Sequence, residues 1–80
     1  MKEEKTLEEL ITVHDTLKQK VPDAVLLSII KRQDEYIVLY RDDSNTVTPY
    51  VIHHINSSGL YFGHYYDNWY VAGEDFAAMR

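Results

Sequence analysis

The residues of this chain that could do chemistry gather near its C-terminal end. Residues 61–70, written YFGHYYDNWY, hold six aromatic side chains and a histidine within ten positions. Two adjacent histidines, His53 and His54, come shortly before this stretch. Imidazole binds metal ions and exchanges protons near neutral pH, and clustered aromatic rings are typical of binding surfaces. The pattern therefore raises three possibilities: a metal site, an acid–base site or a contact surface.

The metal possibility depends on how two expected strands pair. Asn56–Gly59 is a strong turn signal, so we expect a hairpin in which His53 lies opposite Phe62 and Val51 opposite His64. This register places His53 and His64 on one face as diagonal neighbours, close enough to share a metal ion. Two imidazoles are only half of a usual zinc site, and the pattern places no carboxylate on that face. We therefore predict no metal and no cofactor, and expect each histidine to pack and hydrogen-bond a neighbour.

The acid–base possibility is His54 beside Tyr61, which the same register makes direct neighbours. General acid–base catalysis also needs an orienting group and a pocket, and the sequence shows neither. It contains no nucleophile motif, glycine-rich phosphate loop or paired-carboxylate signature. We therefore expect no enzymatic activity. The face that carries His54 is instead the expected partner-binding surface, and its predicted contact residues are Tyr50, His54, Tyr61 and Tyr65.

The composition narrows the class of protein further. Eighty residues make one domain, and the lack of cysteine excludes disulfides and thiolate metal sites. A formal net charge of −5 argues against a nucleic-acid partner. The N-terminal sequence MKEEKTLEEL is charged where a signal peptide needs an apolar core, and no apolar run reaches membrane-spanning length. We expect a cytoplasmic protein with no membrane partner.

The first expected element is a helix from about Leu7 to about Lys20. Thr6 and Glu9 have the spacing of a capping box, and Pro22 prevents the helix from continuing. Residues 1–5 are expected to fray. One apolar stripe should face the core, and Val13 lies off it. The residues of the stripe are Leu7, Leu10, Ile11, His14, Leu17 and Val21.

Four strands and a second helix should follow. The strands are expected at residues 25–30, 36–40, 47–55 and 60–66, and the first two are apolar on both alternating faces. Asp67 or Asn68 should cap the helix, which directs Trp69, Ala72, Phe76 and Met79 inward. The expected fold class is α+β, in the order α-β-β-β-β-α, with a four-stranded antiparallel meander. Both helices should pack on one face, leaving a tyrosine-rich face open.

The last 40% of the chain or so, from Thr48 to Arg80, resembles a loose group of small uncharacterised bacterial and phage-borne proteins. The residues that carry the resemblance are Pro49-Tyr50-Val51-Ile52-His53, Gly59-Leu60-Tyr61-Phe62-Gly63-His64-Tyr65-Tyr66, Asn68-Trp69, Ala72 and Asp75-Phe76. It implies a compact architecture in which a G-H-Y-aromatic strand leads into a short helix. It also implies an accessory protein, often from a mobile element, and it implies no catalytic residue.

These observations predict a small non-enzymatic protein that self-associates, as a homodimer for example, or binds another protein through the tyrosine-rich sheet face. Two alternatives remain. The acidic surface could instead block a basic host protein, as an anti-defence factor from a mobile element would. The second alternative is a module that binds a metal or a small ligand through His53 and His64.

Overall fold

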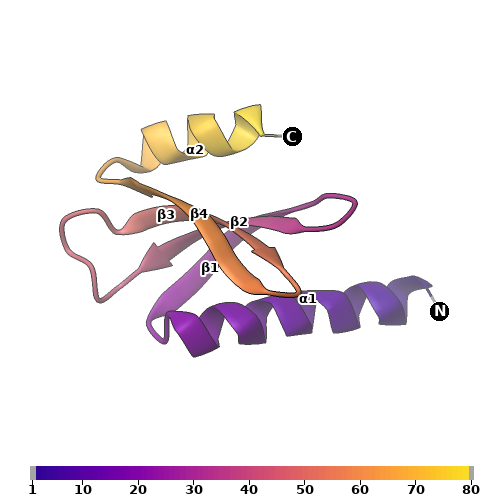
Figure 1. Ribbon diagram of the computed structural model, residues 1–80. Helices are drawn as coiled ribbons and strands as arrows, with labels where there is room; N and C mark the ends of the chain where they lie inside the picture. The colour runs from indigo at the N-terminus through magenta and orange to yellow at the C-terminus, as the bar shows by residue number, and fades with distance from the viewer. Residues whose placement is uncertain (1, 80) are drawn as a thin grey trace.

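The computed structural model of the protein describes residues 2–79, with side chains from Glu8 onward, as a helix, four strands and a second helix (Figure 1). The elements are α1 (Lys2–Lys20), β1 (Ala24–Lys31), β2 (Tyr36–Asp42), β3 (Tyr50–Asn56), β4 (Gly59–Tyr66) and α2 (Trp69–Ala78). All neighbouring strands pair antiparallel in the order β1-β2-β3-β4. This confirms the predicted α-β-β-β-β-α order and the antiparallel meander.

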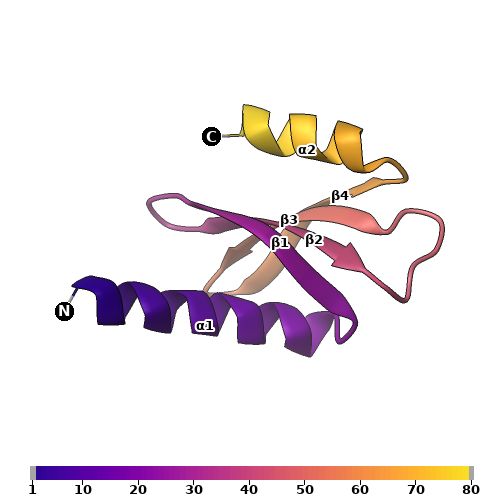
Figure 2. The ribbon, with the colours of Figure 1, turned by 180° about the vertical axis from the view of Figure 1, so that it is seen from behind.

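The helices lie on opposite faces of the sheet, so the prediction that both pack on one face is wrong (Figures 1 and 2). Val38 and Tyr40 of β2 join a buried cluster with α1, whereas Ile37 and Leu39 join a second cluster with α2. Successive side chains of a strand point to opposite faces. Because the central strands are apolar on both sides, each face needs its own cover, and one helix supplies each.

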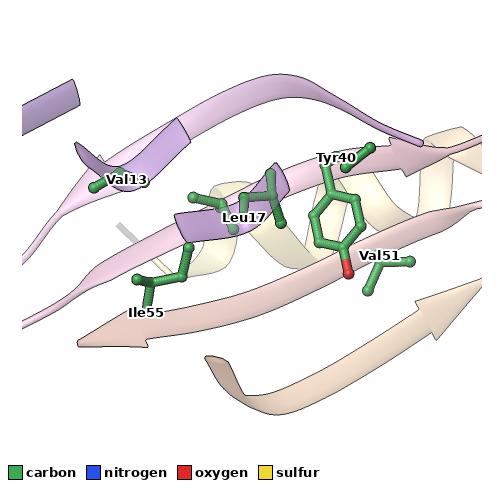
Figure 3. Packing of buried hydrophobic residues seen from close by; sticks show 7 residues of the cluster. Val13, Leu17, Tyr40, Val51 and Ile55 are labelled. Atoms are coloured by element: carbon green, nitrogen blue, oxygen red, sulfur yellow. The ribbon is translucent and has the colours of Figure 1, made fainter. Parts of the chain in front are cut away.

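The core on the α1 face is built around Leu17, which is fully buried (Figure 3). Leu17 and Val13 pack with Tyr40 of β2 and with Val51 and Ile55 of β3. Ala24 and Val38 complete the buried set. A four-residue spacing places two side chains on the same side of a helix, one turn apart. Val13 and Leu17 are therefore the buried centre of α1, and the prediction that Val13 lies off the buried stripe is wrong.

The start and the rotation of α1 also differ from the prediction. The helix begins at Lys2, so Thr6 lies inside it rather than at its cap. The lysines and glutamates before Thr6 are good helix formers and permit the extra turn. Leu10 and Ile11 remain 37% and 52% exposed instead of facing the core. The fraying expected for residues 1–5 concerns dynamics and stays a prediction; residue 1 lies outside the described part.

Glu9 fixes the rotation of α1 against the sheet. Its carboxylate accepts hydrogen bonds from the ammonium of Lys31 at 2.7 Å and from the hydroxyl of Tyr36 at 2.6 Å. The bond to Glu9 raises the pKa of Tyr36, because a neighbouring carboxylate opposes loss of the phenol proton. These contacts turn the Val13 side of the helix towards the sheet and leave Leu10 and Ile11 towards the β1 edge.

The second helix is held at both of its ends. Asn68 is its N-cap, as predicted, and its side chain accepts from the amides of Tyr70 and Val71. At the other end the guanidinium of Arg32 donates to the carbonyl oxygen of Met79. Ala72 and Phe76 are buried against the sheet as predicted, whereas Trp69 is half exposed. No helix in the described part of the chain is long and apolar enough to cross a membrane.

Candidate functional site

A β-bulge in β4 decides where its side chains point. Ile55 pairs with Leu60 and His54 with Tyr61, both as predicted, but Ile52 pairs with His64. Two residues of β4, Phe62 and Gly63, therefore lie opposite His53 alone. The predicted pairs beyond Tyr61 are wrong by one residue. An extra residue exchanges the two faces for every later position of the strand.

The bulge separates the two histidines proposed as a metal pair. His64 lies opposite Ile52 on the α2 face, whereas His53 lies on the α1 face, where Val38 is its partner across the strands. Among the described residues no group of three or more histidine, aspartate or glutamate side chains could hold a metal ion. The sequence-based arrangement of His53 and His64 as diagonal neighbours on one face is therefore wrong.

The bulge also divides the predicted partner-binding set. Tyr50, His54 and Tyr61 share the α2 face, but Tyr65 pairs with Val51 and lies on the α1 face. The first three are only partly exposed, whereas Tyr65 is 56% exposed. The face that should have been open is covered over Tyr50, which packs against the α2 cluster. Tyr50, His54 and Tyr61 thus lie at the rim of the exposed surface, and Tyr65 alone of the four is exposed.

His53 fills the space that the bulge creates. Its Nδ1 lies 2.8 Å from the hydroxyl of Tyr40, which donates to it in the tautomer that carries the ring proton on Nε2. The His53 ring stacks on the Tyr40 ring and meets the Tyr65 ring edge-on, both with centroids 5.8 Å apart. Burial lowers the pKa of His53, and the nearby imidazoles of His64 and His54 lower it further. His53 is a neutral packing residue of this corner.

Gly63 is required beside that ring. A Cβ atom at Gly63 would lie 2.5 Å from Nε2 of His53 and 3.0 Å from the Tyr65 ring. Both rings are held by their contacts with each other, and Tyr40 holds His53 as well. Glycine at this position therefore reflects close packing against the histidine.

His54 is oriented by a carboxylate. Its Nδ1 lies 3.0 Å from Oε2 of Glu35, and the side chains are 19% and 21% exposed. The rings of Tyr61 and Phe62 flank it at centroid distances of 5.3 and 5.7 Å. The sequence indicated no orienting group because Glu35 is remote from His54 along the chain; Glu35 lies two residues before Ile37, the cross-strand partner of His54.

A carboxylate-oriented imidazole can accept a proton, so this pair has one part of an acid–base site. Turnover also requires a nucleophile or bound substrate within hydrogen-bond reach of the second ring nitrogen. Three hollows along α1, of about 390, 470 and 290 Å³, are lined by residues other than His54. In the structure the ring packs between Tyr61 and Phe62 as part of an aromatic cluster.

Exposed aromatic side chains follow β4 and continue into the first turn of α2. We call these residues the β4 edge strip; they are Phe62, His64, Tyr65, Trp69 and Tyr70, and the strip includes both faces of the edge, because His64 and Tyr65 point to opposite sides of the sheet. β4 is the last strand of the sheet and carries no charged residue (Figure 1). Phe62 and Tyr70 are the most open of its apolar members, at 70% and 73% exposed.

Two partly exposed tyrosines, Tyr50 and Tyr61, form the rim of the strip. The ring of Trp69 lies 6.4 Å from that of Tyr50, and Tyr61 lies 5.0 Å from Phe62. The surface predicted from the sequence lacks Phe62 and Tyr70, and the helical pattern directed Trp69 inward. Only their place in the run YFGHYYDNWY could have indicated them.

Phe62 is presented at an energetic cost. It is the one non-glycine residue with a positive φ, 51°, in the part of the chain that the structure describes. A phenylalanine in this region costs on the order of 1–2 kcal/mol, and the glycine that would avoid the cost is the next residue. The strained residue thus places a large apolar ring in solvent at an exposed strand edge.

Comparisons with protein-family models, with curated proteins and with solved structures found no match for this chain.

Proposed function

We propose that this is a non-enzymatic interaction protein that binds another protein through the β4 edge strip. The observation that carries the proposal is Phe62, an exposed aromatic residue held at positive φ on an edge strand. Strained residues persist where surrounding structure holds them and are concentrated at functional sites. An outward-facing phenylalanine contributes little to the core, so contact with a partner is the role that its strain supports.

The chemistry of the strip indicates the kind of partner surface. Tyrosine and tryptophan are enriched at the centres of protein interfaces, where rigid rings lose little entropy on binding. The backbone of an edge strand can also pair with an extended segment of another chain. Because β4 carries no charge, the partner surface should be apolar with polar groups at its rim. The cytoplasmic location expected from the sequence stays a prediction.

The alternative of an acidic inhibitor has less support. Glu9 and Asp43 bind Lys31 and Arg41 of the same chain at 2.7 and 2.6 Å. Binding through the strip should depend weakly on salt, whereas an acidic inhibitor should lose its basic target as ionic strength rises. The salt dependence of partner retention therefore separates the two.

The experiment uses Phe62→Gly, which removes the ring and relieves the positive φ together. Relief of the strain should offset the loss of the ring contacts with His54 and Tyr61, and circular dichroism checks that the variant is folded. Combined with Tyr70→Ser, it should lower retention of a partner from the source cells by about tenfold or more. Val47→Ser, at a site 76% exposed in the loop before β3, is the matched control and should keep the partner. Equal retention by wild type and the double variant would refute the proposal.

A further inference from the structure

The opposite edge of the sheet carries a second unpartnered surface. β1 is the other edge strand, and α2 packs mainly on β2, β3 and β4, with Ile30 of β1 at the margin of the α2 cluster. A groove of about 390 Å³ runs between α1 and β1 and is mostly apolar. Figure 2 shows β1 on the near side, above α1. The groove is lined by Leu10, Ile11, His14, Leu26, Leu27, Ser28 and Ile29.

Part of the apolar stripe of α1 is not used by the monomer. Leu10, Ile11 and His14 belong to the stripe that the sequence directs inward, yet Val13 and Leu17 take the buried positions. On β1, Leu27 is 41% exposed and lines the same groove. The exposed apolar side chains of two elements thus meet along one edge, and contiguous patches of this kind mark interaction sites.

We propose that a second copy of this chain covers this edge, by antiparallel pairing of β1 with β1 of the partner about a two-fold axis. The axis passes between Leu27 and Ser28. The proposal does not depend on the function proposed for the β4 edge strip, which lies at the other side of the sheet and stays free in such a dimer.

The face pattern of β1 is self-complementary about this axis because of its own bulge. Pairing with β2 shifts between Leu26 and Ser28, so that Leu26 and Ile29 lie on the α1 face. Val25 and Ile30 lie on the α2 face. With Leu27 opposite Ser28 of the partner, Leu26 meets Ile29 and Val25 meets Ile30, each on a matching face. A strand without a bulge would not have this symmetry.

The backbone pattern agrees with the same register. Arg32 N–H donates to the Glu35 carbonyl oxygen, and Asp43 N–H donates to the Asp23 carbonyl oxygen. These two bonds show, at each end of β1, which residues direct their backbone groups towards β2. Because bonding alternates along an antiparallel pair, the backbone groups of Leu26 and Ile29 face away from β2. The proposed register sets Leu26 of each copy opposite Ile29 of the other. Pairing is confined to the middle of the strand, because Ala24 already bonds to Val21 and Lys18.

Charge favours a second copy over an unrelated partner. The chain carries a net charge of −5, but Ala24–Ile30 contains no charged residue. Asp23 precedes this run, and Lys31 and Arg32 follow it. In the proposed register Asp23 of each copy approaches Arg32 of the other beyond the paired segment, so opposite charges lie near each other at both ends; the Arg32 guanidinium also donates to the Met79 carbonyl oxygen of its own chain. The axis is perpendicular to the sheet, so both α1 helices lie on one face and Leu10 and Ile11 enlarge the contact.

The oligomeric state tests the proposal. Light scattering between about 1 and 500 µM should show a monomer–dimer equilibrium. Leu27→Lys places two like charges beside the axis and should raise the dissociation constant at least about tenfold. Val47→Lys introduces the same charge at an exposed site in the loop before β3 and should leave the dimer intact. Circular dichroism confirms that each variant is folded. A wild type that stays monomeric, or a dimer that Leu27→Lys does not weaken, would overturn the proposal.

A disulfide test checks the register, since the chain contains no cysteine of its own. In the proposed dimer the two copies of residue 28 lie about one position apart, within the reach of about 4–7 Å between Cα atoms that a disulfide allows. Ser28→Cys should therefore form a covalent dimer under mild oxidation. The two copies of residue 25 lie about five positions apart, and Val25→Cys should not. Cross-linking of Val25→Cys as readily as Ser28→Cys would refute the register.

Discussion

His53 lies between a tyrosine hydroxyl and a bulge, and its surroundings favour the neutral ring. Tyr40 and Tyr65 cover it, and burial lowers its pKa, helped by the neighbouring His64 and His54. Burial also raises the pKa of Tyr40, so the hydroxyl keeps its proton and stays a donor to His53. At the scale of single residues, the two groups hold each other in the protonation states that the packing requires.

The lowered pKa of His53 predicts that the stability of the protein depends on pH. The folded pKa of His53 lies below its unfolded value of about 6.5, so the unfolded chain binds the proton more readily. The free energy of unfolding should be undiminished above about pH 6.5 and should fall as the pH decreases from there through the folded pKa. Urea denaturation at about pH 7 and pH 5.5 measures the change.

His53→Asn removes the titrating group and should reduce that loss of stability. If His53→Asn and the wild type lose the same stability over this pH range, the burial of neutral His53 is not its cause.

At the scale of elements, replacing glycine by alanine should have opposite effects on stability in β4 and in α2. Gly63→Ala places a Cβ atom against the held ring of His53 and should destabilise the protein by about 1–3 kcal/mol. Gly73 lies inside α2, and a Cβ atom there would meet no atom within 4 Å. Gly73→Ala should therefore stabilise the protein by about 0.5–1 kcal/mol. Thermal and urea unfolding of both variants measure the difference; a tolerated Gly63→Ala would contradict the close packing.

At the scale of the whole molecule, two cores share one sheet. β2 and β3 supply alternate residues to the α1 cluster and to the α2 cluster, so neither core can form without the strands of the other. Tyr66 connects strand and helix on the α2 side: its hydroxyl donates to Asp75 at 2.8 Å, and burial, with that bond, raises its pKa to about 12. The domain should therefore unfold as one unit.

Adjacent residues of β2 test that coupling. Val38→Ala weakens the α1 core and Leu39→Ala the α2 core, each by about 2–4 kcal/mol. Trp69, the only tryptophan, reports on the α2 side through its fluorescence, and far-ultraviolet circular dichroism reports on both helices. The two signals should shift together in both variants. A fluorescence transition that moves for Leu39→Ala and stays fixed for Val38→Ala would show two independent units.

The sequence by itself determined the parts of the structure that depend on local chemistry. The order of elements, the turn at Asn56–Gly59, the cap at Asn68 and the apolar character of both faces of the first two strands follow from preferences within a few residues. For the candidate surface it indicated the region, residues 61–70, and one exposed member, Tyr65. The near pairs of the hairpin, such as His54 with Tyr61, followed from the turn alone.

Only the tertiary structure decided which side chains share a face. The bulge at Phe62 and Gly63 moved His64 and Tyr65 to the faces opposite those expected, because it depends on how the ring of His53 packs against Tyr40 of β2 and against Gly63 and Tyr65 of β4. Two-sided strands needed a helix on each side, and the bonds to Glu9 turned Val13 inward and left Ile11 exposed. The spacing of apolar residues shows which side chains share one side of a helix or strand. Packing between remote segments decides which of those apolar side chains are buried.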